Sequence, residues 1–371
     1  MYLAEWMMWM SNLKPDEWFM KNVADNGQMA FSWTPTFEEN VAQERAVQKA
    51  KRFDRAVSRG PVYAANDVFL EMRCGGMEDK RGLITLASGV FVGMMTYGWA
   101  LSSGLILFGM LAGSTKALGN PIDEGQVFDL LLDVILFGVP LWLYFRHAFR
   151  LSRLELLTSR HLLARFNRIT RQVYLHRPPS CGGILVLPWD GISSLELAGQ
   201  GLMLGWFPND TLLPFPAYAF DGKQSSQLGD LQSEWEFIRR YMDEGGVQAV
   251  EKPRISSQLP LPWPAFTAQF DALWPFLRNS GPVVWLGCLL ISPAFVILGL
   301  SHWASLLLCW RPRWPRIIRE AGQAGKPVPA FSTVEDYPPD VRAQLLANAH
   351  RWALRPGRAP DNRQRGREDA R

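Results

Sequence analysis

The chain has 371 residues, 48% of them hydrophobic, and a formal net charge of +4. This length accommodates about two or three units of ordinary domain size, and so small a net charge does not indicate nucleic-acid binding. The four cysteines form no CxxC pair, which argues against a disulfide framework and against a structural zinc site. We therefore expect neither a metal nor another cofactor, and the distribution of apolar residues becomes the main source of information.

Residues 1–81 are predicted to form a soluble, helical N-terminal region. Thr36 and Glu39 have the spacing of a capping box, and apolar residues then recur at helical spacing from Val41 to Val57. The polar face of this helix is rich in Lys and Arg. Such a face fits either a solvated surface or a surface that rests on anionic lipid.

Two long apolar blocks make an integral membrane protein the default interpretation. The first block, within residues 82–150, contains two candidate spans, Leu83–Phe108 and Phe128–Phe145, and so predicts a transmembrane hairpin. The second block occupies residues 281–310. Both blocks are expected to be helical, because hydrocarbon offers no hydrogen-bond partners to open backbone groups.

The flanking charges predict the orientation of the hairpin. Residues 146–177 hold eight Arg and one Glu, whereas the loop Ser114–Gln126 has Lys116 against Asp123 and Glu124. Positively charged flanks stay on the cytoplasmic side of a membrane. We therefore expect an external loop, with the bulk of the chain in the cytoplasm.

The second block conflicts with its own flanking charges. It is long enough for one tilted span, but the segments on both sides of it are predicted to be cytoplasmic. Pro293 lies near its centre, so we favour a broken, re-entrant hairpin over a single span. Around it, we expect an interfacial helix at residues 251–280, a cytoplasmic helical region at 311–352 and a disordered tail at 353–371.

The middle region, residues 151–250, has the pattern of a small strand-rich domain. Short apolar runs separated by turn residues are followed by an amphipathic helix, with Asp230 as its N-cap and Gly245 at its end. Trp235 and Ile238 would plug the open corner of a barrel. The predicted fold is therefore an α+β membrane protein with a cytoplasmic antiparallel, β-barrel-like, pleckstrin-homology-like domain closed by one helix; a generic α+β domain is the alternative. The expected strands are Leu163–Phe166, Gln172–Leu175, Ile184–Leu187, Ile192–Leu197, Leu202–Phe207 and, as an edge strand or loop, Leu212–Phe220.

Two groups of residues are candidates for a site. Asp129 and Asp133 lie four positions apart near the external end of the second span, and carboxylates at membrane depth often mark ion or proton paths. The alternative is that Asp133 is simply bonded to a neighbouring helix or to water. A second group could contact lipid headgroups; its members are Arg165, Arg168, Arg171 and Arg177.

Several short motifs are spread over residues 140–316. They are Arg165-Phe166-Asn167-Arg168, Leu187-Pro188-Trp189-Asp190, Trp235-Glu236-Phe237-Ile238 and Arg313-Trp314-Pro315. In these motifs the chain resembles an uncharacterised family of bacterial inner-membrane proteins encoded near type VI secretion effectors. The resemblance implies an immunity or accessory protein in the bacterial inner membrane, with the lipid bilayer and a secreted toxin as partners.

No GxSxG elbow, P-loop or HExxH motif occurs in the chain, so we expect a protein that is not an enzyme. The leading hypothesis is protection of the cell from a toxin that acts at the membrane. A lipid-sensing membrane scaffold is the main alternative, and a transport subunit that uses Asp133 is a weaker one. The sequence does not indicate the oligomeric state.

Overall fold

The protein is described here by a computed structural model, which covers residues 2–14, 52–116, 124–197, 201–221, 228–271 and 274–349. The predicted capping box at Thr36, most of the helix that follows it and the tail 353–371 lie outside these residues. The chain divides into two compact units. The apolar unit consists of Glu78–Thr158 and Pro260–Trp310, and the sheet unit of the described residues of Tyr2–Met77, Ser159–Leu259 and Arg311–Arg371.

The sheet unit contains one antiparallel sheet in the order β5-β4-β3-β2-β8-β7-β6, with β1 paired to β2. In the part of the chain that the structure describes, no ladder joins β5 to β6, so the antiparallel sheet does not close into the barrel-like domain that the sequence predicted. The strands are β1 (Val62–Ala65), β2 (Phe69–Cys74), β3 (Leu162–Asn167), β4 (Gln172–His176), β5 (Ile184–Pro188), β6 (Ile192–Leu197), β7 (Gly201–Trp206) and β8 (Ala217–Asp221).

Strands β1 and β2 correct the predicted domain boundaries. They lie in the region 1–81, which was expected to be helical and separate, yet β2 pairs along its whole length with β3. Cys74 at the end of β2 also pairs with Asp221 of β8, so β2 joins the two halves of the sheet. The described N-terminal residues, including helix α1 (Leu3–Leu13), therefore belong to the same unit as the middle region.

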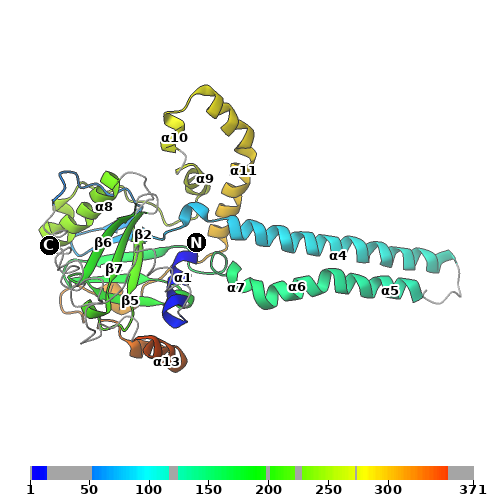
Figure 1. Ribbon diagram of the computed structural model, residues 1–371, viewed down its shortest axis with the longest axis horizontal. Coiled ribbons are helices and arrows are strands. Elements are labelled where there is room, and N and C mark those ends of the chain that lie inside the picture. The colour runs from blue at the N-terminus through cyan, green and yellow to red at the C-terminus, as the bar shows by residue number, and fades with distance from the viewer. Residues whose placement is uncertain are drawn as a thin grey trace, which may run out of the picture. The chain divides into compact units, whose positions relative to one another are not determined.

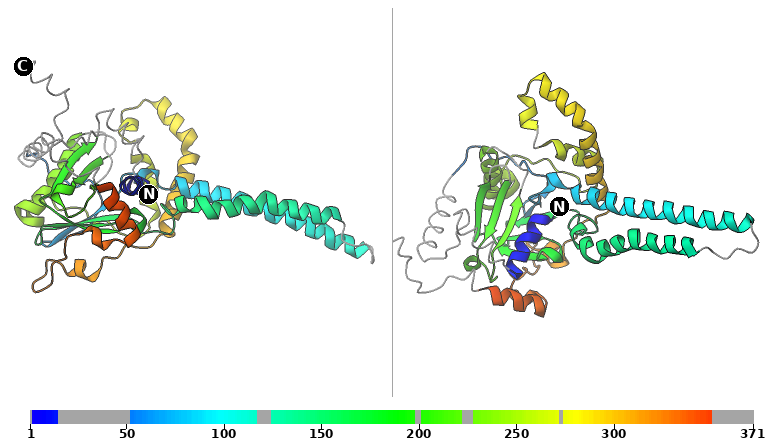
Figure 2. Two further views of the ribbon diagram at one scale, coloured as in Figure 1. Left: turned by 60° about the horizontal axis from the view of Figure 1, so that its bottom comes forward. Right: turned by 45° about the vertical axis from the view of Figure 1, so that its right-hand side comes forward.

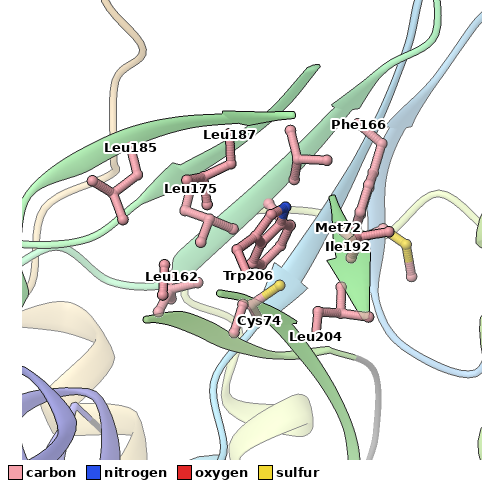
Figure 3. Close-up of a cluster of buried hydrophobic side chains, with 14 of the residues drawn as sticks. Met72, Cys74, Leu162, Phe166, Leu175, Leu185, Leu187, Ile192, Leu204 and Trp206 are labelled. Atoms are coloured by element: carbon pink, nitrogen blue, oxygen red, sulfur yellow. The ribbon is translucent and has the colours of Figure 1, made fainter. Parts of the chain in front are cut away.

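The main core lies on one face of the sheet and is centred on Trp206. This indole is fully buried, and side chains from β2 to β7 surround it, among them Leu175, Leu187 and Leu204 (Figure 3). Its ring nitrogen donates to the Pro188 carbonyl oxygen at 2.9 Å, which satisfies the one polar group that the burial would otherwise strand. Because side chains alternate along a strand, every second residue of β3 to β5 contributes to this core.

The opposite face of β3 to β5 is also covered. Leu163, Tyr174 and Val186 pack there against Trp314 and Ile318, and Ile318 belongs to the short helix α12 (Arg316–Glu320). Every residue of β3 is consequently buried. The segment that follows the second apolar block therefore covers this face of the sheet.

The predicted closing helix is present as α8 (Leu228–Arg240), which contacts β6 and β7. Trp235 and Ile238 are buried against the sheet as expected, and Trp235 stacks on Trp189 with ring centroids 5.8 Å apart. Asp230 is not the N-cap, because α8 already includes it; its carboxylate instead pairs with Arg59. Helical turns continue from α8 to Gly245, the residue at which the sequence placed the end.

The apolar unit begins with two long helical stretches that run side by side (Figures 1 and 2). The first is α4 (Leu83–Lys116). The second is continuous from Glu124 to Ser152 and alternates between α-helix (α5, Glu124–Asp133; α6, Val139–Leu143; α7, Phe149–Ser152) and π-helical turns. Three helices, Leu83–Gly109, Phe128–Ser152 and Pro282–Leu307, are long and apolar enough to cross a membrane.

The second apolar block forms one continuous helix, α11 (Pro282–Leu307), with Pro293 inside it. The break predicted at Pro293 is therefore wrong. Helix α9 (Pro262–Asp271) instead packs antiparallel to the C-terminal half of α11 (Figure 1): Phe266 contacts Gly299, and the rings of Phe270 and Phe295 have centroids 5.0 Å apart. A short helix, α10 (Trp274–Arg278), precedes α11.

In the sheet unit, α13 (Pro339–Asn348) adds Leu345 to the main core.

Candidate functional site

The four arginines predicted to contact headgroups do not form a common cationic surface. Arg165 and Arg177 are each only 7% exposed, and burial lowers the pKa of the Arg177 guanidinium. Arg171 is held by Asp190 at 2.6 Å and by Asp243 at 2.7 Å, while Arg168 donates to the Asp67 carbonyl oxygen at 3.3 Å. These four arginines are therefore poorly suited to binding anions together, because Arg165 and Arg177 are buried and two carboxylates already neutralise Arg171.

Arg165 belongs instead to a buried ionic network around Glu71. The two residues face each other across β2 and β3, and both Nε and Nη2 of Arg165 donate to Glu71 Oε2, at 3.0 and 2.6 Å. The Trp314 indole nitrogen donates to the same oxygen at 2.7 Å, and Gln258 Nε2 donates to Oε1 at 3.0 Å. The Arg165 guanidinium also lies 4.1 Å from the Phe69 ring centroid, so its charge is compensated on several sides.

A pocket with two arginines adjoins this network. Its cavity, about 290 Å³, is lined in part by Tyr63, Arg160, Ser256, Ser257, Gln258 and Arg311, and we call it the two-arginine pocket. Arg160 Nη1 donates to the Gln258 backbone oxygen at 3.0 Å, and Arg311 Nε donates to Gln258 Oε1 at 2.5 Å. One glutamine therefore orients both guanidinium groups, and its own amide is fixed by Glu71.

The two carboxylates of the second helical stretch have different surroundings. Asp129 is exposed, whereas Asp133 is only 6% exposed and accepts hydrogen bonds from Ser102 and Ser103 of α4, at 2.7 and 3.2 Å. Asp133 thus joins two neighbouring helices, which is the structural alternative that the sequence left open. The pair does not form one shared polar site.

Replacing Asp133 with alanine is expected to destabilise the contact between α4 and α5 by about 1 kcal/mol, because both serine hydroxyls lose their acceptor. Thermal unfolding of the purified protein in detergent measures the change. The matched control is Asp129→Ala, since Asp129 is the exposed carboxylate on the same helix. Equal destabilisation by the two variants would contradict the assignment of a structural role to Asp133 alone.

Glu155 is the centre of a polar cluster in which the start of α4 and the end of α11 meet. Glu155 caps α4 from outside the helix: its carboxylate accepts from Gly82 N, from Ile84 N at 3.2 Å and from Thr85 Oγ1 at 2.7 Å. The Glu155 backbone oxygen accepts from Ser305 Oγ at 3.1 Å. The start of α4, the chain just after α7 and the end of α11 are therefore in direct contact.

The beginning of the α9 segment lies at this same end of the unit. The indole nitrogen of Trp303, near the end of α11, donates to the Pro260 carbonyl oxygen at 2.9 Å. Farther along, Gln269 Nε2 and His302 Nδ1 are 3.2 Å apart. Both chain ends of the segment Pro260–Trp310 are thus adjacent within the apolar unit.

A buried carboxyl group on α8 is the strongest candidate for a pH response. Glu234 is 2% exposed and accepts from Arg59 N at 2.5 Å, from Gly60 N at 3.1 Å and from Ser58 Oγ at 3.2 Å. Burial, followed by the negative charge of Asp221, raises the pKa of Glu234 to about 8. The folded protein therefore holds a proton on Glu234 over a range of pH in which the unfolded chain releases it.

Between pH 4.5 and about 8 the contribution of Glu234 makes the free energy of unfolding fall as pH rises, because the folded state binds the additional proton in that window. The variant Glu234→Gln stays uncharged and is expected to show a flatter dependence. The unfolding midpoint, followed by tryptophan fluorescence across the window, tests this. The exposed Glu335 provides the control Glu335→Gln, which should retain the slope of the parent protein; an unchanged slope for Glu234→Gln would refute the assignment.

Sequence reasoning did not identify the two-arginine pocket or the network beside it. Glu71, Arg165, Gln258 and Trp314 are separated by dozens of positions, and nothing local marks Gln258 or Arg160. The one available signal was the occurrence of Arg165 and Trp314 in the motifs that carry the family resemblance. Among the described residues, no group of His, Cys, Asp and Glu is arranged to hold a metal ion.

Comparison with known proteins adds no assignment. No family model matches the chain, and neither the curated proteins nor the solved structures yielded a match.

Proposed function

We propose that the protein is a membrane-anchored scaffold, in which the apolar unit lies in the bilayer and holds the sheet unit at the cytoplasmic surface. The observation that carries the proposal is the meeting of chain ends around Glu155 and Trp303. Every connection from the apolar unit to the sheet unit leaves from this end: Glu78 and Thr158 bound the first segment, and Pro260–Trp310 is the second. The sheet unit is built from the other three segments, Tyr2–Met77, Ser159–Leu259 and Arg311–Arg371. Because these segments fold together, the proposal assigns all three to the same side of the membrane.

In the proposal, the two segments of the apolar unit pass through the bilayer in different ways. The segment Glu78–Thr158 contains two helices of crossing length and returns to its starting side. The segment Pro260–Trp310 contains one such helix, α11, while α9 is too short to cross the ~30 Å hydrocarbon core alone. In the proposal this segment enters and leaves on the cytoplasmic side, with its reversal between α9 and α11 instead of at Pro293.

The sheet unit supports comparison with a pleckstrin-homology-like domain. Its seven strands β2 to β8 follow one another as antiparallel neighbours in two groups, and α8 packs on β6 and β7 after the last strand. The open edge between β5 and β6 departs from a closed barrel. In the proposal this unit presents a binding surface, and no catalytic step is assigned to it.

The anchoring proposal is tested by fractionation of cells that produce the full chain. We expect the protein in the membrane fraction, and we expect it to stay there after an alkaline carbonate wash and to require detergent for release. Release by the alkaline wash would contradict integral insertion. Deletion of residues 83–152 is not a suitable test, because it removes Thr85 and the start of α4. The buried Glu155 carboxylate would lose these hydrogen-bond donors, and the variant could misfold for that reason alone.

The immunity role implied by the family resemblance remains a second proposal. It assigns toxin binding to the loop Ser114–Gln126 and to the intramembrane faces of the helices, and the exposed apolar side chains on α4 and α11 are compatible with either lipid or a protein partner. Deletion of the gene, followed by challenge with sister cells, tests it. Unchanged survival against every effector that the sisters deliver would refute the immunity role and leave the anchoring proposal intact.

A further inference from the structure

The two-arginine pocket has the charge expected of an anion site. Its described lining residues include two guanidinium groups and several neutral hydroxyl and amide groups, but no carboxylate. The neighbouring carboxylate, Glu71, is already occupied by Arg165, Trp314 and Gln258. The described lining therefore presents two cationic side chains, and at about 290 Å³ the cavity fits a small polar group better than a large apolar ligand.

The arginines of the pocket are oriented before any ligand arrives. Gln258 Nε2 donates to Glu71 at 3.0 Å, which turns Gln258 Oε1 toward Arg311 Nε at 2.5 Å. The Gln258 backbone oxygen accepts from Arg160 at 3.0 Å. Guanidinium groups fixed in this way lose little side-chain entropy on binding, and their planar fork suits phosphate oxygens.

The position of the pocket along the chain relates it to the bilayer. Arg160 comes two residues after Thr158, Leu259 immediately precedes Pro260, and Arg311 immediately follows Trp310; Thr158, Pro260 and Trp310 are boundary residues of the apolar unit. If the apolar unit spans the hydrocarbon, these residues lie at the depth of the headgroups. Arginine at that depth attracts anionic lipid on the cytoplasmic leaflet.

We propose that the two-arginine pocket binds a phosphate group, and that an anionic phospholipid headgroup presents it. The source of the phosphate rests on the proposed membrane anchoring, whereas the chemistry of the pocket does not. Arg160 and Arg311 would donate hydrogen bonds to the phosphate oxygens, and the hydroxyl groups of Ser256 and Ser257, which also line the pocket, could donate further ones.

Native mass spectrometry of the full-length protein in detergent tests the proposal with phosphatidylglycerol and, separately, phosphatidylcholine. The parent protein should retain phosphatidylglycerol preferentially. The double variant Arg160→Gln/Arg311→Gln should bind it roughly tenfold or more weakly, since it loses both charge-assisted contacts. The matched control Arg316→Gln/Arg319→Gln removes the same charge from exposed positions of α12 and should bind like the parent.

A second arm uses inorganic phosphate at constant ionic strength and follows thermal unfolding. Stabilisation by phosphate without preferential binding of phosphatidylglycerol would assign the pocket to a soluble phosphate compound and overturn the lipid source. Equal phosphatidylglycerol binding by the parent and the double variant would overturn the pocket itself. If the double variant fails to fold, Arg311→Lys at an exposed position keeps the charge and should still weaken binding. Fractionation of each variant with membranes reports on the anchoring proposal separately.

Discussion

Replacing Glu71 with alanine is expected to lower the free energy of unfolding of the sheet unit by about 3–5 kcal/mol, because it strands a buried guanidinium. Arg165 then keeps its position beneath Trp314 without the carboxylate that it faces across the sheet. The Trp314 indole and the Gln258 amide lose the same acceptor. Thermal unfolding of the purified full chain, followed by near-ultraviolet circular dichroism, measures the loss.

Two comparison variants separate this effect from the loss of any carboxylate. Glu320 pairs with the exposed Arg316 at 2.6 Å, and Glu320→Ala should leave the unfolding midpoint unchanged, because exposed ion pairs contribute little. The double variant Glu71→Leu/Arg165→Met should recover part of the lost stability, since an apolar pair replaces a buried ion pair. If Glu71→Ala is as stable as Glu320→Ala, the network does not support the fold in the way described here.

Replacing Trp235 with alanine is expected to destabilise the sheet unit by about 3–5 kcal/mol, since it empties the volume of a large buried ring in the main core. The ring stacks on Trp189, so the cavity would open between α8 and the turn that follows β5. Urea unfolding monitored by tryptophan fluorescence gives the change in midpoint.

The control for this variant is Leu228→Ala on the same helix, where the side chain is 49% exposed. Its effect should be small, because little apolar surface leaves the core. Trp235→Phe should fall between the two, since it keeps an aromatic ring and removes an indole nitrogen that has no hydrogen-bond partner among the described residues. An alanine variant that unfolds with the parent midpoint would show that α8 does not close the main core.

Strands β3 to β7 could be predicted from the sequence because each is a short apolar run between turn residues. Strand β2 could not. Its sequence carries Glu71 and Arg73, which suggest a surface, and the partner that neutralises Glu71 lies 94 positions away. The burial of Arg165 was not predictable for the same reason. This residue was predicted to contact lipid headgroups, but it pairs with Glu71 and is buried beneath the segment that follows α11.

The apolar helices were predictable from length and composition, but the conformation at Pro293 was not. A proline inside a helix removes one hydrogen bond, and in soluble proteins it often ends the helix. In α11 the helix continues through it, as happens in membrane helices whose neighbours compensate for the lost bond. The conflict between flanking charges that suggested a re-entrant path was nevertheless informative, because Trp303 and Pro260 bring the two ends of that segment together.

The sidedness of residues on either side of α11 tests the central proposal most directly. Single cysteines replace the exposed Lys252, before the segment Pro260–Trp310, and the exposed Lys326, after it; a third replaces Ser114, the first residue of the predicted external loop. A membrane-impermeant maleimide is applied to right-side-out and inverted vesicles, with the parent chain and its four cysteines as background. The proposal predicts that Lys252→Cys and Lys326→Cys react only in inverted vesicles and Ser114→Cys only in right-side-out ones. Reaction of Lys252→Cys and Lys326→Cys from opposite sides would contradict it.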